Sequence, residues 1–501
     1  MKKRFLKSVS IVSIVAIIVK LFGFIRQIIT ASAFGATTET DIIFMSEGLI
    51  ANVEFILMQI IATSFVSIYI HARSKDELSA NSFTLNAFLF FLLIGLMLAG
   101  TFVALSDLIS FALAPSYSEN LRNVLSNYIK LFSPLLLGFS LIAVSVGVLN
   151  ANKRFVPGQL IGLTQSVVII LMTFVFKDII GVRVLVYGYF IYVIINLLFI
   201  FLLSKKYWKF KKTNLFKDYN ILAMLKMILP LLISYSMIFL NQQVDKSILS
   251  GFESGTITAV GYAAVLMNFV LSLIEIISTV LYPQIVELVA TDNIDGAYNK
   301  TFLYMILTIT AVIPISFISF LLSKDIVTIV FGHGSFDSSA INMAAIGLMG
   351  YSLCFVPFSI KCFSNKLFYS QKRTKIVTLT STIGIACNIG LSIFLSRFFG
   401  IIGVTLATSI AEIICASLNI FFLFRKRKIN LKIPLLSFAL LWLIGLVYCI
   451  IVGFLLKNLI DENNAILRFL IVSSGCLIGY GLLTIPFIIS FKKRRLALND
   501  L

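Results

Sequence analysis

The segment VKLFGFIRQIITASAFGATTETDIIF, residues 19–44, sets the pattern for the whole chain. It ends one long apolar run and begins another, with a short polar turn between them. A hydrocarbon core about 30 Å thick needs about 20 apolar residues per helix, and both runs are long enough to cross it. Lys20 and Arg26 nevertheless interrupt the first run. The segment therefore predicts two membrane-spanning helices, of which the first carries charge inside the membrane.

Similar apolar runs recur through all 501 residues, which are 59% hydrophobic and 13% charged, and the mean hydropathy is +1.02. This composition excludes a soluble globular protein, and the polar intervals are too short to fold as a catalytic domain, so an enzyme is not expected. The basic, apolar N-terminus resembles a signal peptide, but no small-residue cleavage site follows, and we interpret it as a retained helix. We predict an all-α polytopic membrane protein with about fourteen transmembrane helices, at 8–32, 42–71, 84–113, 121–150, 156–177, 181–204, 221–250, 256–288, 298–323, 339–369, 374–396, 400–424, 434–457 and 465–490.

The distribution of lysine and arginine predicts the orientation. Most of the 41 basic residues lie in segments that this helix count places on one side, including KKYWKFKK (205–212), RKRKINLK (425–432) and FKKRR (491–495). Cytoplasmic loops retain positive charge during insertion, so both termini are expected in the cytoplasm of a bacterial inner membrane. The net charge of +19 then reflects this bias and attraction to anionic membrane lipids, and we expect no nucleic-acid partner. The six cysteines have no close pair in the sequence, so neither a metal site nor a disulfide framework is expected.

Short segments repeat across the chain. IIGV occurs at 179–182 and 401–404, NANKRF (150–155) resembles YSQKRT (369–374), and ATTETD (36–41) resembles SGTITA (254–259), all at offsets near 219 residues. An even number of helices per copy gives two pseudo-symmetric halves with the same orientation, which rock against each other in transporters of this kind. The predicted domains are a six-helix half at 1–204, a basic cytoplasmic linker at 205–220, a second half at 221–430, and an extra helix pair with a basic tail at 431–501.

Charges inside the membrane are candidate functional residues, because each costs roughly 2.5–3.5 kcal/mol at the bilayer centre. Lys20 and Arg26 in the first helix suit a diphosphate, and Gly23 between them is a candidate hinge. Glu47 and Glu54 share one face of the second helix. The alternative is that these glutamates form structural salt bridges with the two cations.

The second half repeats the theme with further polar and charged residues inside predicted helices. They are candidates for a cavity or for ion coupling, although a structural role is favoured for most of them: Asp245, Lys246, Asn268, Glu275, Lys361 and Glu412.

The opening segment resembles the lipid II flippase (MurJ/MviN) family of the multidrug, oligosaccharidyl-lipid and polysaccharide (MOP) exporter superfamily. The matching positions are Lys20, Gly23, Arg26, the Phe34–Gly35–Ala36 triplet and Asp41. Weaker similarity at 260–290, 329–336 and 366–375 extends it over nearly the whole chain. The resemblance implies a MATE-like fold and a central cavity for a sugar-diphosphate headgroup, with Asp41 among its residues. It also implies a groove for the polyprenyl tail beside the last two helices.

Two positions depart from the family pattern, which usually has arginine where this chain has Glu54 and Val265. Losing these cations leaves room for a related exopolysaccharide, teichoic-acid or O-antigen unit on the same carrier. A multidrug exporter is less favoured, because Lys20 and Arg26 would repel hydrophobic cations. A membrane glycosyltransferase would need an acidic metal-binding motif or a sizeable external loop, and neither is found.

The expected partners are a polyprenyl-diphosphate-linked glycan and membrane lipids, with the protein acting as a monomer. No cofactor is expected, and no G-x-x-x-x-G-K-[ST] motif for ATP occurs in the sequence. We therefore predict that transport is coupled to a cation, sodium or proton, or to the membrane potential.

Overall fold

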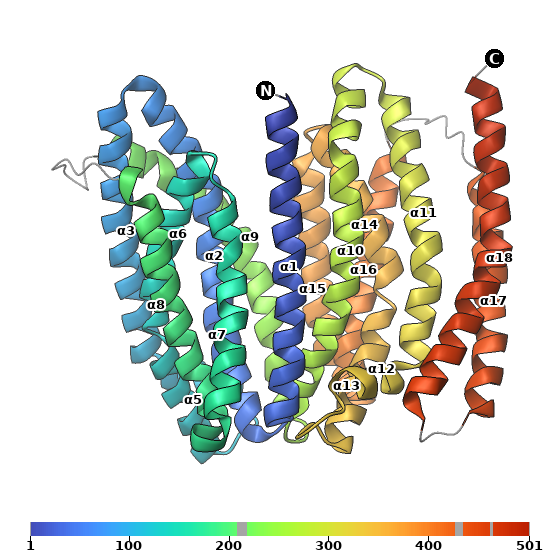
Figure 1. The fold of residues 1–501 in the computed structure, drawn as a ribbon, viewed down its shortest axis with the longest axis horizontal. Helices are drawn as coiled ribbons and strands as arrows, with labels where there is room; N and C mark the ends of the chain where they lie inside the picture. Colours follow the sequence, from blue (N-terminus) through green and yellow to red (C-terminus); the bar gives the residue numbers. More distant parts are fainter. Residues whose placement is uncertain (1, 208–217, 426–433, 461–463, 500–501) are drawn as a thin grey trace. The chain divides into compact units, whose positions relative to one another are not determined.

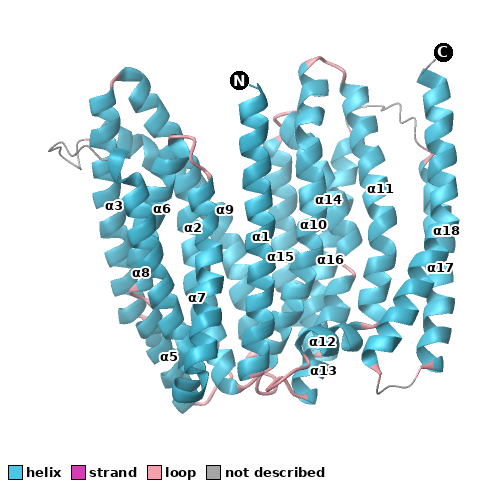
Figure 2. Ribbon diagram, in the orientation of Figure 1, coloured by secondary structure: helices cyan, strands magenta, loops and turns pink. Residues whose placement is uncertain are grey.

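The computed structural model describes residues 2–207, 218–425, 434–460 and 464–499. Within these ranges every regular element is a helix and no strand occurs (Figures 1 and 2). The chain divides into two compact units: unit 1 consists of Met1–Thr258 with Gly334–Phe336, and unit 2 of Ala259–His333 with Asp337–Leu501. The predicted all-α membrane architecture is confirmed.

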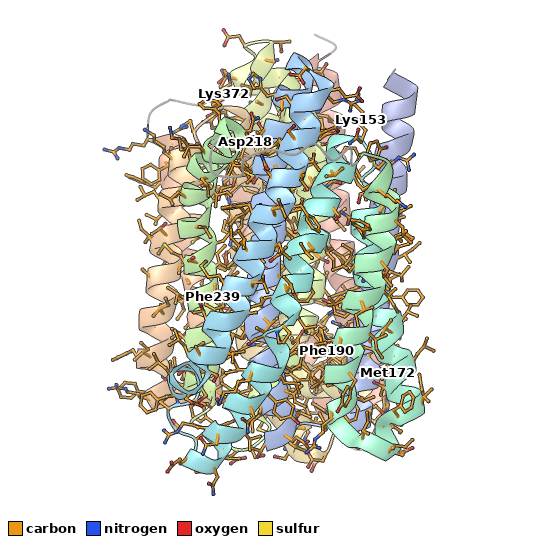
Figure 3. All side chains as sticks on the ribbon, turned by 90° about the vertical axis from the view of Figure 1, so that its left-hand side faces the viewer. Lys153, Met172, Phe190, Asp218, Phe239 and Lys372 are labelled. Carbon is orange, nitrogen blue, oxygen red and sulfur yellow. The ribbon has the colours of Figure 1, made fainter. Side chains whose placement is uncertain are left out.

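Unit 1 is organised around α2, which packs against α3, α5, α6 and α9, while α1 packs mainly against α7. The side chain of Asn86 donates a hydrogen bond of 2.7 Å to Asp218, which caps the start of α9. In Figure 3, Lys153 and Asp218 lie near one end of these helices and Met172 lies near the opposite end. The helices are α1 (Lys2–Phe34), α2 (Thr38–Lys75), α3 (Glu77–Ala104), α4 (Ser106–Leu113), α5 (Glu119–Phe132), α6 (Leu135–Ala151), α7 (Val156–Ile180), α8 (Val184–Ser204) and α9 (Tyr219–Leu249), with the short 3-10 turns η1 (Gly181–Arg183) and η2 (Lys205–Tyr207).

Unit 2 is organised around α16, which packs against α13, α14 and α15, and α11 packs against α14. The last two helices, α17 and α18, pack against each other and against α11. The indole of Trp442 donates a hydrogen bond of 2.8 Å to Thr310, which joins α17 to α11. The helices are α10 (Thr256–Ala290), whose first turn belongs to unit 1, α11 (Ile294–Leu321), α12 (Ser323–Phe331), α13 (Ser338–Ser352), α14 (Phe355–Ser370), α15 (Thr374–Phe399), α16 (Ile401–Phe424), α17 (Leu435–Leu459) and α18 (Ala465–Asn499).

Eleven helical stretches of the described chain are long and apolar enough to cross a membrane, or twelve if α13 and α14 form one span bent by 46°. One stretch, Val156–Ser204, has 49 residues and contains both α7 and α8. A straight helix of that length would measure about 74 Å, more than twice the hydrocarbon core, so two crossings are required. Counting α7 and α8 separately and adding α9 gives fourteen. Length and composition alone do not confirm that number.

Two predicted helices are broken in the structure. The helix expected at 121–150 ends at Phe132 and resumes at Leu135, because Pro134 lacks an amide hydrogen and its ring obstructs the preceding turn. The helix expected at 339–369 breaks between α13 and α14, three residues before Pro357. Pro283 and Pro314 instead lie inside the continuous helices α10 and α11.

Backbone conformation locates the internal repeat more accurately than the sequence did. Lys153 and Lys372, 219 residues apart, both have left-handed backbones, with φ of 61° and 58°. The turns around them have the same hydrogen bonds, Arg154 N to Leu149 O and Arg373 N to Phe368 O, each 2.9 Å.

The IIGV match is out of register by three residues. The helix ends before it are Gly181 (φ 59°, ψ −144°) and Gly400 (φ 61°, ψ −134°), again 219 apart, whereas IIGV pairs Gly181 with Gly403. The offset of 219 is therefore supported, and the offset of 222 is wrong.

The predicted domain limits stay a prediction. The boundary between the compact units falls at Thr258, after α9, whereas α9 was expected to begin the second half. Most of the basic linker and part of the predicted 425–432 segment lie outside the described residues.

Candidate functional site

Arg26 is the cation of α1 that the fold leaves with an unused donor. Thr30, one turn further along, donates its hydroxyl hydrogen to the Arg26 carbonyl at 2.8 Å. The guanidinium is partly buried, and its Nη1 atom is shielded from solvent and donates to no described residue. A shielded guanidinium nitrogen without an acceptor carries a desolvation cost that an anionic ligand would offset.

Two tyrosines of α8 hold the two glutamates of α2. Tyr189 donates its phenol hydrogen to Glu47 Oε1, and Tyr192 donates to Glu54 Oε2 at 3.3 Å. The two rings meet edge to face with centroids 5.5 Å apart, which fixes both phenols. Within the described residues, no ion pair joins Arg26 to either glutamate. The glutamates are therefore held by neutral donors, and the salt bridges considered as their alternative role are not formed.

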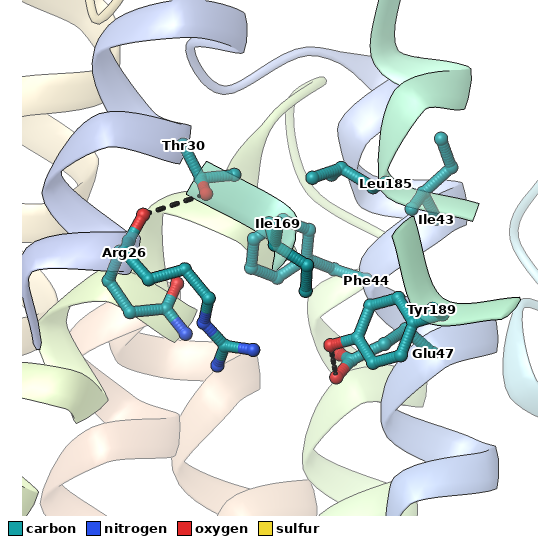
Figure 4. Close-up of a pocket in the computed structure, with 9 residues that line it drawn as sticks. Arg26, Thr30, Ile43, Phe44, Glu47, Ile169, Leu185 and Tyr189 are labelled. Carbon is teal, nitrogen blue, oxygen red and sulfur yellow. Dashed lines mark hydrogen bonds between the residues drawn. The ribbon is translucent and has the colours of Figure 1, made fainter. Parts of the chain in front are cut away.

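Arg26 and the Glu47–Tyr189 pair line one small pocket (Figure 4). Its volume is about 30 Å³, which is enough for water but far too small for a sugar diphosphate. The lining combines three polar groups of α1 with apolar side chains of α2, α7 and α8: Arg26, Gln27, Thr30, Ile43, Phe44, Glu47, Ile169, Leu185 and Tyr189. In this state the pocket can hold one small polar group between a cation and a carboxylate.

Lys246 of α9 brings a second cation to α2. Its ammonium donates a hydrogen bond of 3.2 Å to the carbonyl of Phe44, which also lines the pocket. Gly48 permits this approach, because a Cβ atom there would lie 2.0 Å from Lys246 Nζ. Glycine at position 48 thus provides the space in which Lys246 contacts α2.

Gly48→Ala should displace the Lys246 ammonium and break its bond to Phe44. The lysine side chain is flexible, so we expect the free energy of unfolding to fall by about 1 kcal/mol or less, while transport falls several-fold. Melting temperature and transport rate measure the two effects. Gly100→Ala is the matched control, since nothing lies within 4 Å of a Cβ at that helical glycine. Equal transport by both variants would remove Lys246 from the candidate site.

Asp41 is engaged with the start of α10. It is 2% exposed, and its carboxylate accepts hydrogen bonds from the backbone amides of Gly255 at 2.8 Å and Thr258 at 2.7 Å. Gly255 has φ of 84°, and a Cβ there would lie 2.2 Å from the Ala36 carbonyl oxygen, so only glycine fits. Both carboxylate oxygens are occupied by these bonds. Participation of Asp41 in headgroup binding stays a prediction.

Asp41→Ala should lower the free energy of unfolding by about 2 kcal/mol, because two amides at a helix start lose their charged acceptor. Asp41→Asn retains one acceptor oxygen and should lose less. Thermal unfolding in detergent gives the order. Glu39→Ala is the matched control, because Glu39 is an exposed acid in the same first turn of α2. A melting temperature for Asp41→Ala equal to that of the control would contradict this role.

The remaining candidates of α1 contact little. Lys20 is exposed, and a Cβ at Gly23 would meet no heavy atom within 4 Å, so Gly23 does not permit a close helix approach here. The helix α1 runs without a break through Gly23. The hinge role of Gly23 and the headgroup role of Lys20 stay predictions.

In unit 2 the structure brings two of the predicted residues together. Lys361 of α14 and Glu412 of α16 form an ion pair, with side chains 21% and 19% exposed. Asn268 and Glu275 are exposed on α10. Asp245 lies on α9 in unit 1, beside Lys246, and is partly buried. Lys361 and Glu412 thus have the structural partnership that was favoured for them, and a coupling role for any of these residues stays a prediction.

Several important residues were missed in the sequence. Tyr189 and Tyr192 are spaced three apart in an otherwise apolar helix, a spacing that places two phenols on one helix face and was a usable signal. Arg468 and Asp325 form a buried ion pair, although both were assigned to loops or helix ends. Cys449 and Cys476, expected to lie apart, are neighbours on α17 and α18, and both are free.

Comparison with known proteins identifies the family. The model of the lipid II flippase MurJ family matches residues 30–475. Probable lipid II flippases MurJ from Buchnera aphidicola subsp. Schizaphis graminum and from Borreliella burgdorferi are 27% and 25% identical, over 85% and 87% of both chains respectively.

Solved structures agree with the fold. A lipid II flippase MurJ in an inward closed conformation superposes with a TM-score of 0.82 at 23% identity, covering 96% of this chain and 99% of the other. An inward-facing MATE multidrug transporter of the MOP superfamily gives 0.64 at 12% identity, covering 82% and 96%. The MATE-like fold expected from the resemblance is confirmed, and the chain belongs to the MurJ family of lipid II flippases.

Proposed function

We propose that this protein moves lipid II, an anionic polyprenyl-diphosphate-linked cell-wall precursor, from the inner to the outer leaflet of the bacterial cytoplasmic membrane by alternating access. The observation that carries the proposal is the family match across residues 30–475. A transporter of this kind performs no covalent chemistry. Its task is to pass a charged headgroup through a low-dielectric barrier while the apolar tail stays in lipid.

The site in unit 1 supports an anionic headgroup. Arg26 has a shielded donor without a partner, and arginine forms forked hydrogen bonds with phosphate oxygens. The pocket beside it, at about 30 Å³, does not admit the headgroup. Headgroup binding therefore requires a second state with a wider cavity, as alternating access provides.

A related lipid-linked oligosaccharide is the second candidate substrate. Glu54 stands where the family usually has arginine, and Tyr192 holds its carboxylate in place. Removing a cation and adding a carboxylate weakens attraction for a diphosphate, which favours a substrate with a different headgroup. A hydrophobic cation, as a multidrug exporter carries, is a poor match for a site containing Arg26 and Lys246.

Depletion of the protein in its host distinguishes the two substrates. Mass spectrometry of polyprenyl-linked intermediates should show accumulation of lipid II. Accumulation of another lipid-linked glycan with lipid II at its normal level would contradict the lipid II proposal and favour the second candidate.

We further propose that no resident cofactor or metal takes part and that the membrane potential, or a sodium or proton gradient, drives transport. An inside-negative potential contributes about 2.3 kcal/mol per charge per 100 mV to outward movement of an anion. The positive charge distribution supports cytoplasmic termini, and the protein is proposed to act as a monomer among membrane lipids. Transport that is unchanged after the potential and both gradients are dissipated would contradict the coupling.

A further inference from the structure

A basic pocket lies at the turn between α14 and α15 in unit 2, apart from the candidate functional site. Its volume is about 480 Å³, within the range of small-molecule sites. Its described lining contains four cations, Lys372, Arg373, Lys375 and Arg425, and no carboxylate, together with Thr374, Ile376 and Phe422. Four like charges around one space repel each other unless an anion is present.

The pocket has a rigid side. Arg373 donates a hydrogen bond of 3.2 Å to the Phe422 carbonyl and one of 3.3 Å to the Gln371 side chain. Its guanidinium also stacks over Phe368, with 5.1 Å between the guanidinium carbon and the ring centroid. These contacts use two of its five N–H donors, which leaves a fixed cation with donors to spare.

The start of α15 adds a favourable field. This helix has 26 residues, begins at Thr374 inside the pocket lining, and has no side-chain cap. Uncapped amides at a helix N-terminus carry partial positive charge and favour an anion. Lys372 and Lys375 are exposed, so both ammonium groups can turn towards a ligand.

We propose that this pocket binds a phosphate group of a second, non-transported ligand, and that the phosphate belongs to an anionic phospholipid headgroup of the cytoplasmic leaflet. Clustered cations at the cytoplasmic ends of membrane helices recognise such headgroups. Phe421, Phe424 and Leu379 on the adjoining helices are 55%, 39% and 48% exposed, which supplies an apolar surface for acyl chains. A soluble phosphate has the same headgroup chemistry but no use for that surface.

The test uses the full-length protein purified in neutral detergent. Native mass spectrometry measures binding of phosphatidylglycerol and cardiolipin, with phosphatidylcholine as the lipid without net charge, and a separate titration uses inorganic phosphate alone. The variant Lys372→Gln/Lys375→Gln removes two cations, each contributing about fivefold near a membrane surface, so its affinity for anionic lipid should fall about thirtyfold.

The matched control is Lys153→Gln/Arg154→Gln, which removes two cations from the corresponding turn of unit 1, where Lys153 has the same left-handed backbone as Lys372. Lys372→Arg/Lys375→Arg should keep binding, which separates lost charge from lost folding. A thirtyfold loss confined to anionic lipid supports the lipid headgroup. Saturable stabilisation of the wild type by inorganic phosphate alone, absent in the glutamine variant, supports the phosphate site but assigns it to a soluble anion. Equal lipid affinity in the glutamine variant and its control overturns the proposal.

Discussion

Arg26→Gln is expected to reduce lipid II transport by about a hundredfold while leaving the amount and melting temperature of the protein nearly unchanged. Two charge-assisted hydrogen bonds to a phosphate contribute about 3 kcal/mol together, which corresponds to that factor. The fold should tolerate the change, because Nη1 of Arg26 donates no hydrogen bond within the described chain. Transport by the purified variant in vesicles, together with its thermal unfolding curve, measures both effects.

Two further variants locate the cause. Arg26→Lys keeps the charge but loses the fork, so its transport should lie between those of wild type and glutamine variant. Lys177→Gln removes an exposed cation from α7 and should transport normally. Normal transport by Arg26→Gln would show that the headgroup does not contact Arg26.

Arg468→Ala should lower the free energy of unfolding by about 3–5 kcal/mol, the largest effect on stability expected in this protein. Arg468 of α18 is 6% exposed and donates from Nε to Asp325 Oδ2 at 2.9 Å, and its Nη2 donates to the other oxygen. Asp325 of α12 is 2% exposed. Removing either partner leaves an uncompensated buried charge, so Asp325→Ala should cost a similar amount.

The double variant Asp325→Leu/Arg468→Leu should be much more stable than either single variant, because it removes both buried charges. Lys457→Gln is the control, since Lys457 makes one hydrogen bond of 3.1 Å, to the Leu321 carbonyl, near the same end of α17. It should cost about 1 kcal/mol. Single variants that unfold like this control would show that the ion pair does not attach α18 to α12.

The fold was predictable because the bilayer limits a long apolar chain to helices. The limits of α7, α9 and α16 agree with the sequence to within a few residues. The breaks at Pro134 and at the start of α14 were harder to place, because many membrane helices continue through proline, as α10 does at Pro283. The repeat was detectable, but its register came from the backbone angles of Lys153 and Lys372.

The candidate site was predictable only in part. Charges in apolar runs identified Arg26, Glu47, Glu54 and Lys246, because each is costly in the membrane. Their partners depend on which helices are neighbours. Opposite charges suggested that Arg26 would pair with the glutamates, whereas the packing of α8 against the bundle supplies Tyr189 and Tyr192 instead.

Asp41 shows the same limit. Nothing in the local sequence indicates that its carboxylate reaches amides more than 200 residues away, at Gly255 and Thr258. A residue matched through a family motif can therefore have a structural partner that the motif does not reveal.

The central claim is that this protein moves lipid II across a bilayer, and flipping by the purified protein tests it most directly. Labelled lipid II would be placed in the inner leaflet of proteoliposomes, and its exposure to an impermeant reagent followed over time. We predict rapid exposure with the wild type, about a hundredfold slower exposure with Arg26→Gln, and none above background in protein-free vesicles. Exposure at the protein-free rate with folded wild-type protein, under an imposed potential and cation gradients, would contradict the claim.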